Sequence, residues 1–203
     1  DYIPGNMYFT TTKLHQELAG GTFVDVIIDE AHDPANEHPF KANVDLNKLE
    51  DLILDKGAEN IPYVAISTTV NMAGGQPISL SNLKLVRELT QKYGIKIIHD
   101  MTRVAENAYF IKEREAKYKD KSIQEIARET FDLADIFLMS SKKDGLVNIG
   151  GLIAIKEDED LYNDCRTYIV PMSPHAYIHK HVMKLANAWK VPESLTGGKC
   201  TTL

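Results

Sequence analysis

The segment 81–99, SNLKLVRELTQKYGIKIIH, combines an amphipathic helix with the β-strand that follows it. Leu83 and Val86 have the spacing that places apolar side chains on one face of a helix. Gly94 is placed to end this helix, because glycine readily adopts the left-handed conformation found after a helix C-terminus. Ile95–His99 is a short run rich in β-branched residues, and it predicts a strand.

The same alternation of strand and helix extends from about residue 23 to residue 162. Asp45 can cap a helix that ends at Gly57, and Ser122–Glu125 (SIQE) is a capping box that opens another helix. Strands separated by helices of this length need crossover connections, so the sequence predicts an α/β fold with a mainly parallel sheet and helices on both faces. Further strands are predicted from apolar, β-rich runs at residues 23–28, 61–69, 136–140 and 152–155.

The composition limits the possible classes of protein. At 203 residues and 43% hydrophobic, the chain is sufficient for one sizeable α/β domain. The net charge of −6 argues against a nucleic-acid-binding surface, which needs clustered Lys and Arg. No apolar run approaches the roughly 18 residues of a membrane span, and the first residues, DYIPGNMYF, have no signal-peptide pattern. Cys165 and Cys200 are too few for a disulfide framework, so we expect a reduced, cytoplasmic protein.

The regular order of elements breaks down near the C-terminus. From about Ser173 the alternation stops, and no clear amphipathic period replaces it. The sequence therefore predicts a partial large domain at residues 1–172 and a poorly specified tail at residues 173–203. Three histidines of the tail are interpreted as incidental rather than as a metal site, because they lie outside any clear element: His175, His179 and His181.

Polar side chains gather where three of the predicted strands end. In open α/β sheets ligands bind beyond the carboxyl ends of the strands, so we expect these side chains at one edge of the sheet. The clusters are Asn71 after the strand at 61–69, then Asp100, Thr102 and Arg103 after the strand at 95–99, and finally Ser140, Ser141, Lys142 and Lys143 after the run that begins at Ile136.

This set of side chains fits a pyridoxal phosphate site. The cofactor needs an amine, and the charge of Lys142 would favour the neutral, nucleophilic form of its neighbour Lys143. Asp100 is suited to hold a proton on the ring nitrogen, which keeps the ring electron-withdrawing. Ser140 and the turn after it offer a hydroxyl and backbone N–H groups to the phosphate.

Each of these residues also has a plain structural explanation. An aspartate at the end of a strand, such as Asp100, is commonly a turn or cap residue. A lysine pair such as Lys142 and Lys143 is usually solvated surface, and Arg103 can be a surface ion-pair residue. The residues alone leave these alternatives open beside the cofactor site.

Five ordered segments between residue 5 and about residue 170 resemble the family of β-eliminating lyases that contains tyrosine phenol-lyase and tryptophanase. The resemblance implies the large domain of a fold-type I, aspartate-aminotransferase-like enzyme that binds pyridoxal 5'-phosphate. Segments of this length, in this order and spacing, make it specific. They are GNMYFTTT (Gly5–Thr12), TVNMAGGQP (Thr69–Pro77), DMTRVAENAYFIK (Asp100–Lys112), MSSKKD (Met139–Asp144) and VNIGG (Val147–Gly151).

The resemblance implies cofactor-binding roles for individual residues. Lys143 corresponds to the Schiff-base lysine of the family, and Lys142 to the lysine beside it. Asp100 corresponds to the partner of the pyridine nitrogen, Phe9 to the aromatic ring stacked on the cofactor, and Ser140 to a phosphate ligand. Lys143 and Asp100 are accordingly expected to be catalytic.

Further implied roles concern the substrate and a cation. Asn71 and Arg103 correspond to residues that hydrogen-bond the 3-oxygen of the cofactor, and the family's equivalent of Asn71 also lies near the substrate carboxylate. The main-chain carbonyl of Asn148 corresponds to a ligand of a monovalent cation, usually potassium, at a subunit interface. The full-length relative is expected to be a homotetramer that acts on an aromatic amino acid.

The segment around Thr10 favours one branch of the family. Residues 9–12, Phe-Thr-Thr-Thr, resemble the phenol-lyases, whose first threonine lies near the phenol leaving group, whereas tryptophanases typically have Phe-Asp-Thr-Thr. Val147–Ile149 favours the same branch, but segments 113–120 and 165–167 look closer to tryptophanase. We therefore expect conversion of L-tyrosine to phenol, pyruvate and ammonia, with Thr10 as a further catalytic residue. Formation of indole from L-tryptophan is the alternative.

The chain also departs from the pattern of the family. The family's N-terminal arm carries a basic phosphate-binding segment and a tyrosine that assists protonation of the leaving group, and neither is found here. The small domain, with its arginine for the substrate carboxylate, is not found either, and after Met172 the sequence leaves the family's pattern. We expect a truncated or frameshifted gene product, and a non-catalytic fragment is a second alternative.

Overall fold

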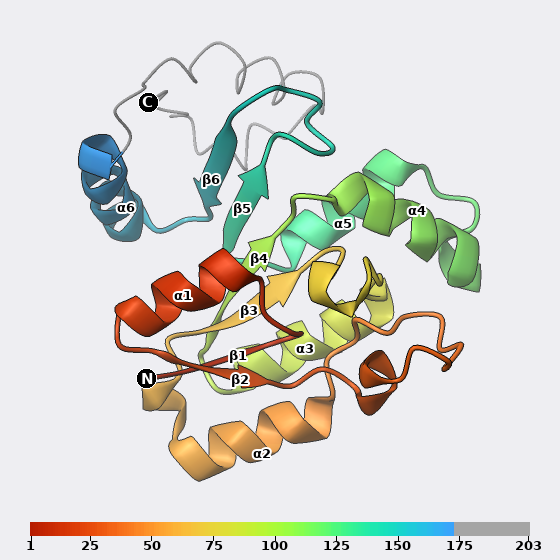
Figure 1. Cartoon of the computed structure of the whole chain (residues 1–203), viewed down its shortest axis with the longest axis horizontal. Helices are drawn as coiled ribbons and strands as arrows, with labels where there is room; N and C mark the ends of the chain where they lie inside the picture. The colour runs from red at the N-terminus through yellow and green to blue at the C-terminus, as the bar shows by residue number, and fades with distance from the viewer. Residues whose placement is uncertain (173–203) are drawn as a thin grey trace.

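The computed structural model describes residues 1–172, which form an α/β fold on a six-stranded sheet (Figure 1). The strand order is β2-β1-β3-β4-β5-β6, and adjacent strands are parallel except for the antiparallel pair of β5 and β6. The predicted mainly parallel sheet is thus confirmed. The strands are β1 (Tyr2–Gly5), β2 (Thr22–Asp25), β3 (Tyr63–Ser67), β4 (Lys96–Asp100), β5 (Ile136–Ser140) and β6 (Gly151–Ile155).

Helices connect most of these strands. The α-helices are α1 (Thr10–Leu18), α2 (Leu46–Lys56), α3 (Leu80–Lys92), α4 (Val104–Arg114), α5 (Ile123–Asp132) and α6 (Glu159–Met172). The short 3-10 helices are η1 (Asp29–His32), η2 (Ala58–Asn60), η3 (Asn71–Ala73) and η4 (Ala116–Tyr118). Within residues 1–172, no helix has both the length and the apolar character needed to cross a bilayer.

Helices α2, α3, α4 and α5 pack on one face of the sheet, and α1 lies on the other (Figure 1). Val64 and Ile66 of β3 are buried beneath the four helices. Because successive strand residues point to opposite faces, Tyr63 lies on the α1 side, where its hydroxyl accepts a hydrogen bond from Gln16 Nε2 at 3.2 Å. The four helices contribute to this core Leu49, Ile53, Leu83, Val86, Ile111 and Ile126.

Three of the predicted helix boundaries are confirmed. The Asp45 carboxylate caps α2 by accepting hydrogen bonds from Asn47 N and Lys48 N at 2.9 and 3.1 Å. Gly57 ends α2 with a φ of 82°, and Gly94 follows α3 with a φ of 69°. Both values lie in the left-handed region, which glycine adopts without a steric penalty.

Other boundaries differ from the prediction. Strand β1 was not predicted, yet it lies between β2 and β3, where a Cβ on Gly5 would be 2.7 Å from the Ala65 carbonyl oxygen. The strand predicted at residues 23–28 ends early, at Asp25, because Asp25 Oδ1 accepts a hydrogen bond from Ile27 N at 3.0 Å and turns the chain. Helices α1, α4 and α6 were not predicted either.

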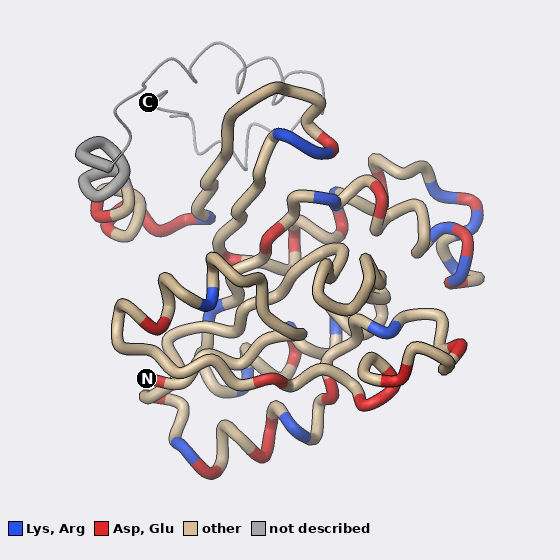
Figure 2. The backbone as a smooth tube through the Cα atoms, in the orientation of Figure 1, with Lys and Arg blue, Asp and Glu red and all other residues tan. Residues whose placement is uncertain are grey.

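Charged residues of both signs are interspersed along the described part of the chain (Figure 2). Several of them join elements that are far apart in sequence. Arg87 of α3 donates two hydrogen bonds to the Asp135 carboxylate, at 2.6 and 2.9 Å. Because Asp135 also accepts from Ile97 N at 2.7 Å, this carboxylate ties α3 to β4 and to the start of β5.

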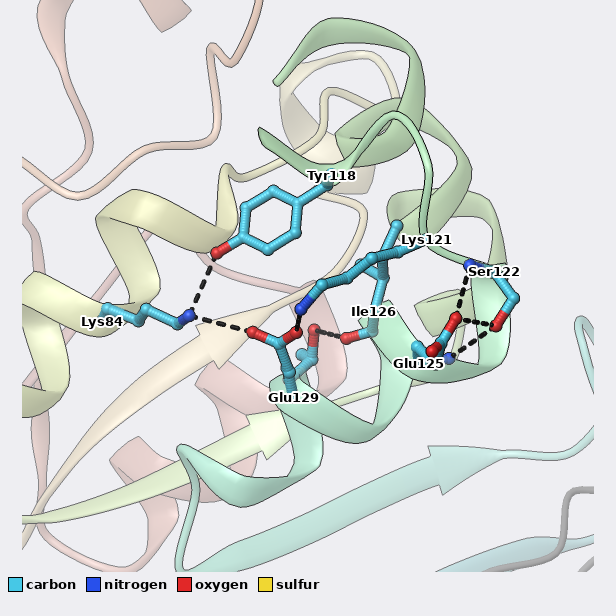
Figure 3. Close-up of polar contacts among 8 residues, drawn as sticks. Lys84, Tyr118, Lys121, Ser122, Glu125, Ile126 and Glu129 are labelled. Atoms are coloured by element: carbon cyan, nitrogen blue, oxygen red, sulfur yellow. Dashed lines mark hydrogen bonds and ion pairs between the residues drawn. The ribbon is translucent and has the colours of Figure 1, made fainter. Parts of the chain in front are cut away.

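The predicted capping box of α5 is confirmed (Figure 3). Ser122 Oγ accepts a hydrogen bond from Glu125 N at 3.2 Å, and the Glu125 carboxylate accepts one from Ser122 N at 2.8 Å. One turn further along, Glu129 accepts a hydrogen bond from Lys84 Nζ at 2.9 Å and pairs with Lys121. These contacts dock α5 and the segment after α4 against α3.

His99 of β4 is a buried histidine on the core side of the sheet. Its side chain is 1% exposed, and its neighbours in the adjacent strands are Ile66 and Phe137. Burial lowers the pKa of His99 from 6.5 to about 3, because the charged form would lose its hydration. The unfolded chain therefore binds more protons between these two pH values, and the free energy of unfolding decreases as the pH falls through this range.

We expect His99 to make the free energy of unfolding about 1.4 kcal/mol lower at pH 5.5 than at pH 7.5. Urea denaturation at both pH values measures this difference. His99→Gln is expected to remove most of it, whereas His15→Gln, at an exposed position of α1, should leave it unchanged. A pH dependence that is the same in the His99→Gln variant and in the unsubstituted chain would contradict this account.

Candidate active site

A pocket lies at the carboxyl ends of β3, β4 and β5, where the three predicted polar clusters meet. Its volume is about 480 Å³, including space open to solvent, and small-molecule sites span roughly 300–1,000 Å³. Ser67 of β3 lies beside Asp100 of β4, which lies beside Leu138 of β5, so the three strands end at nearly the same level. Six of the predicted site residues line the pocket: Phe9, Asn71, Asp100, Arg103, Ser140 and Lys143.

Asp100, the last residue of β4, contributes a carboxylate to the pocket. Its Oδ1 accepts a hydrogen bond from Thr102 N at 3.0 Å, which fixes the turn between β4 and α4. Its main-chain carbonyl accepts hydrogen bonds from Thr68 N at 3.0 Å and from Thr68 Oγ1 at 3.2 Å. Asp100 is therefore both a turn residue, as one interpretation of the sequence held, and part of the lining of the pocket.

Arg103 and Asn71 meet in the lining of the pocket, one from the turn before α4 and the other from η3. The Arg103 guanidinium donates a hydrogen bond to Asn71 Oδ1, and Arg103 N donates one to Thr68 O at 3.1 Å. Arg103 Nε also lies 3.6 Å from Glu106 Oε2 on α4. Arg103 thus makes the ion pair that the sequence left open and still lines the pocket.

Lys143 lies in the turn after β5 and lines the pocket. Its Nζ donates a hydrogen bond to Ser140 Oγ at 2.9 Å. Ser140 N in turn donates to Thr102 Oγ1 at 2.9 Å, which fixes the end of β5 against the turn that follows β4. An amine and a carboxylate therefore reach one pocket from two adjacent strands.

Asn6 holds the segment that leads to Phe9. Its side chain is fully buried, and its Nδ2 donates hydrogen bonds to Ala42 O at 3.0 Å and Ser67 O at 3.1 Å. Its Oδ1 accepts from Ser67 N at 2.8 Å. These bonds tie the end of β1 to the end of β3. The sequence did not single out Asn6, because an asparagine after a strand is commonly a turn residue.

Three of the predicted site residues do not line the pocket. Thr10 is the exposed first residue of α1, directly after Phe9. Lys142 is exposed, although its neighbour Lys143 lines the pocket. Asn148 is exposed in the segment between β5 and β6. The roles of these three residues stay predictions.

Some residues that line the pocket were not assigned a role from the sequence: Tyr8, Ser67, Thr68, Thr69 and Val70. Most of them fell within the strand predicted at residues 61–69, but β3 ends at Ser67 and the following residues turn into the pocket. The hydroxyl of Thr69 is buried and has no hydrogen-bond partner in the described part of the chain. The hydroxyl triplet that ends the run IPYVAISTT was the signal that could have revealed them.

Metal binding by side chains has no support in the described residues. Among them, no group of three or more His, Cys, Asp or Glu side chains is placed to hold a metal ion. The predicted tail, residues 173–203, lies outside the part of the chain that the structure describes. Its histidines, His175, His179 and His181, therefore lie outside it too.

A family model described as "Beta-eliminating lyase" matches residues 2–199 of the chain. The chain belongs to the beta-eliminating lyase family. Within this family it is 62% identical over 170 residues to a tyrosine phenol-lyase from Nostoc punctiforme, a match that covers 84% of this chain and 36% of that protein. It is 58% identical over 169 residues to a tyrosine phenol-lyase from Clostridium tetani, covering 83% and 36% of the two chains. This beta-eliminating lyase chain thus matches about a third of the length of these relatives.

Solved structures share the fold of this beta-eliminating lyase chain at low sequence identity. A PLP-bound protein from Clostridium difficile has a TM-score of 0.60 and 13% identity, covering 98% of this chain and 46% of that one. A PLP-bound C-S lyase from Staphylococcus hominis has a TM-score of 0.56 and 15% identity, covering 82% and 37%. The likeness shows the fold, which is that of the large domain of fold-type I pyridoxal phosphate (PLP) enzymes.

Proposed function

We propose that this chain provides the cofactor-binding part of a pyridoxal-phosphate-dependent site that converts L-tyrosine to phenol, pyruvate and ammonia. The observation that carries the proposal is the meeting of Lys143, Asp100 and Ser140 in one pocket at the carboxyl edge of the sheet. The identity of about 60% to proteins named tyrosine phenol-lyase supports the choice of reaction.

The side chains of the pocket fit the cofactor. Lys143 offers an amine for the aldehyde, and Asp100 offers a carboxylate for the ring nitrogen. Ser140 and the buried hydroxyl of Thr69 offer polar contacts, and the Thr69 hydroxyl lacks a partner within the described residues. A buried hydroxyl without a partner is costly, so a polar ligand in the pocket would remove that cost.

When bound, pyridoxal phosphate supplies an electron-withdrawing ring that stabilises negative charge at the α-carbon of the substrate. Asp100 would hold a proton on the ring nitrogen and so maintain this property. Lys143 would hold the cofactor through its Nζ, and as a free amine it would be placed to accept the proton of the substrate's α-carbon. The hydrogen-bonded pair of Arg103 and Asn71 would hold the 3-oxygen of the cofactor, and Asn71 would also lie near the substrate carboxylate.

The choice of substrate rests on Thr10 and its neighbours. Thr10 directly follows Phe9 in the pocket wall, and its exposed position leaves it free to contact the leaving group. The tryptophanase-like segments 113–120 and 165–167 favour indole formation as the second candidate. The two reactions share every step at the cofactor and differ in the ring that leaves.

A chimera tests the proposed reaction. The 170 matching residues of this chain replace the corresponding segment of the Nostoc punctiforme tyrosine phenol-lyase. We expect release of phenol from L-tyrosine at a rate at least tenfold above release of indole from L-tryptophan, because Thr10 favours a phenol leaving group. Parallel product assays with both amino acids measure the ratio.

Release of indole from L-tryptophan that is faster than release of phenol from L-tyrosine would favour the second candidate, indole formation. A folded chimera that releases neither product, while the unmodified Nostoc protein is active in the same assay, would contradict the proposal and favour a non-catalytic chain.

The proposal includes a cation and an assembly. The segment Val147–Gly151 resembles the family's cation-binding segment, so the carbonyl of Asn148 is proposed as a ligand of potassium. The whole protein is proposed to be a cytoplasmic homotetramer. Replacement of potassium by lithium in the chimera assay tests the first point, and sedimentation analysis tests the second.

A further inference from the structure

The segment between β5 and β6 is anchored to α4 by a carboxylate. Asp144 Oδ2 accepts a hydrogen bond from Ala105 N at 2.7 Å, across 39 positions of sequence. Ala105 lies in the first turn of α4, where backbone N–H groups have no partner within the helix. The N-cap residue of α4, Arg103, makes no side-chain capping bond, so Asp144 provides a cap from a distant part of the chain.

A carboxylate suits this position for a second reason. The N-terminus of a helix carries a partial positive charge, so a negative group is stabilised there. The turn that carries Asp144 is visible in Figure 2 as a basic stretch followed directly by an acidic one, in the loop between β5 and β6. The Asp144 carboxylate is therefore stabilised at the N-terminus of α4. Of the basic residues before it, Lys143 lines the pocket and Lys142 is exposed to solvent.

The turn itself is tightly constrained. Leu146 N donates a hydrogen bond to Lys143 O at 2.9 Å, and Val147 N donates to Ser141 O at 3.2 Å. A Cβ on Gly145 would lie 2.5 Å from Ser141 O, so the backbone is packed on itself. Because Asp144 lies within this turn, fixing its carboxylate also fixes the direction in which Lys143 leaves the backbone.

The opposite end of the same turn is fixed as well. Ser140 N is bound to Thr102 Oγ1 at 2.9 Å, so the two contacts join the lysine turn to the segment that runs from the end of β4 to the first turn of α4. That segment contains Asp100 and Arg103, which line the pocket. The two lysines between these contacts differ in position, because Lys143 lines the pocket and Lys142 is exposed.

We infer that Asp144 is a positioning residue that selects Lys143 over Lys142 as the lysine presented to the cofactor. Without its bond to Ala105 N, the turn keeps its internal hydrogen bonds but loses its contact with α4, so it can shift as a unit and bring the adjacent lysine nearer the pocket. The inference rests on the proposed function in one respect, namely that pyridoxal phosphate is the ligand.

Reductive labelling of the purified chain tests the selection. The chain is incubated with pyridoxal phosphate, reduced with borohydride, and mapped by peptide mass spectrometry to give the ratio of label on Lys143 and Lys142. Asp144→Ala is expected to lower this ratio about fivefold, an effect of the size of a lost helix cap. Asp144→Asn keeps an acceptor for Ala105 N and should retain most of the ratio.

A matched control removes a different helix cap. Asp45→Ala deletes the carboxylate that caps α2 and should cost similar stability without changing the labelling ratio. An unchanged ratio in Asp144→Ala, or an equal loss in Asp45→Ala, would overturn the inference. Should Asp144→Ala not fold, Asp144→Ser takes its place. Because serine has a shorter acceptor, its ratio of label on Lys143 to label on Lys142 is expected to be below that of Asp144→Asn.

A second measurement needs no cofactor. Amide hydrogen exchange in the chain alone should rise in the peptides that cover residues 103–107 and 141–150 in Asp144→Ala, and in neither of them in Asp45→Ala. No rise in segment 141–150 would overturn the inference by itself. If the unsubstituted chain takes no label at either lysine, the proposed cofactor site fails, while the exchange experiment still decides whether Asp144 holds the turn.

Discussion

Replacing Lys143 with alanine is expected to abolish covalent attachment of pyridoxal phosphate to this chain. Lys143 Nζ lines the pocket and is held by Ser140 Oγ at 2.9 Å, whereas the side chain of Lys142 is exposed outside it. Borohydride reduction followed by mass measurement should show one added cofactor in the native chain and none in Lys143→Ala. In the chimera, phenol release should fall by roughly a thousandfold or more, since the covalent amine is lost.

Lys142→Ala is the matched control for this experiment, because it removes the same chemical group one residue away. It should retain labelling, and in the chimera its rate should stay within roughly tenfold of the native rate. Label found on Lys142 alone in the native chain, or full labelling of Lys143→Ala, would show that the cofactor lysine has been assigned wrongly.

The second large effect is expected at Asp100. Asparagine has the same shape and can still accept the hydrogen bond from Thr102 N, so the turn after β4 should survive in Asp100→Asn. The amide cannot hold a proton on the ring nitrogen, and the loss of carbanion stabilisation is expected to cost several kcal/mol, on the order of a hundredfold or more in kcat/KM. Phenol release by the chimera measures this loss.

Asp120→Asn, at an exposed position after η4, is the control and should leave the rate unchanged. The absorbance spectrum of the bound cofactor gives an independent readout, because protonation at the ring nitrogen alters it. Turnover near the native value in Asp100→Asn, with an unaltered spectrum, would remove Asp100 from this role.

Local signals predicted those parts of the fold whose structure is decided locally. The carboxylate of Asp45, the glycines at 57 and 94 and the capping box at Ser122 lie at the helix ends where the sequence placed them. Strand β1 could not be predicted in this way. It is four residues long and ends in Pro4 and Gly5, so it has neither clear alternation nor high β-propensity, and its place in the sheet is decided by pairing with distant strands.

The same distinction applies to the site. The rule that ligands bind at the carboxyl ends of parallel strands brought Asp100, Arg103 and Lys143 together correctly. Thr69 was missed because the strand was predicted to extend to the end of the β-rich run at residues 61–69. Strand β3 in fact ends two residues earlier, at Ser67. The capping of α4 by Asp144 was beyond prediction, because it joins positions 39 apart through the geometry of two turns.

The order of strands across the sheet has a consequence for the growing polypeptide. Strand β1 is made first, yet its partner β3 follows only after residue 62, and the pocket draws on residues from Tyr8 to Lys143. Bringing such distant segments together is entropically costly and comes late in folding. A ribosome therefore has to translate 143 of the 203 residues before every residue that lines the pocket is present, and a stop codon ahead of position 143 removes its lysine.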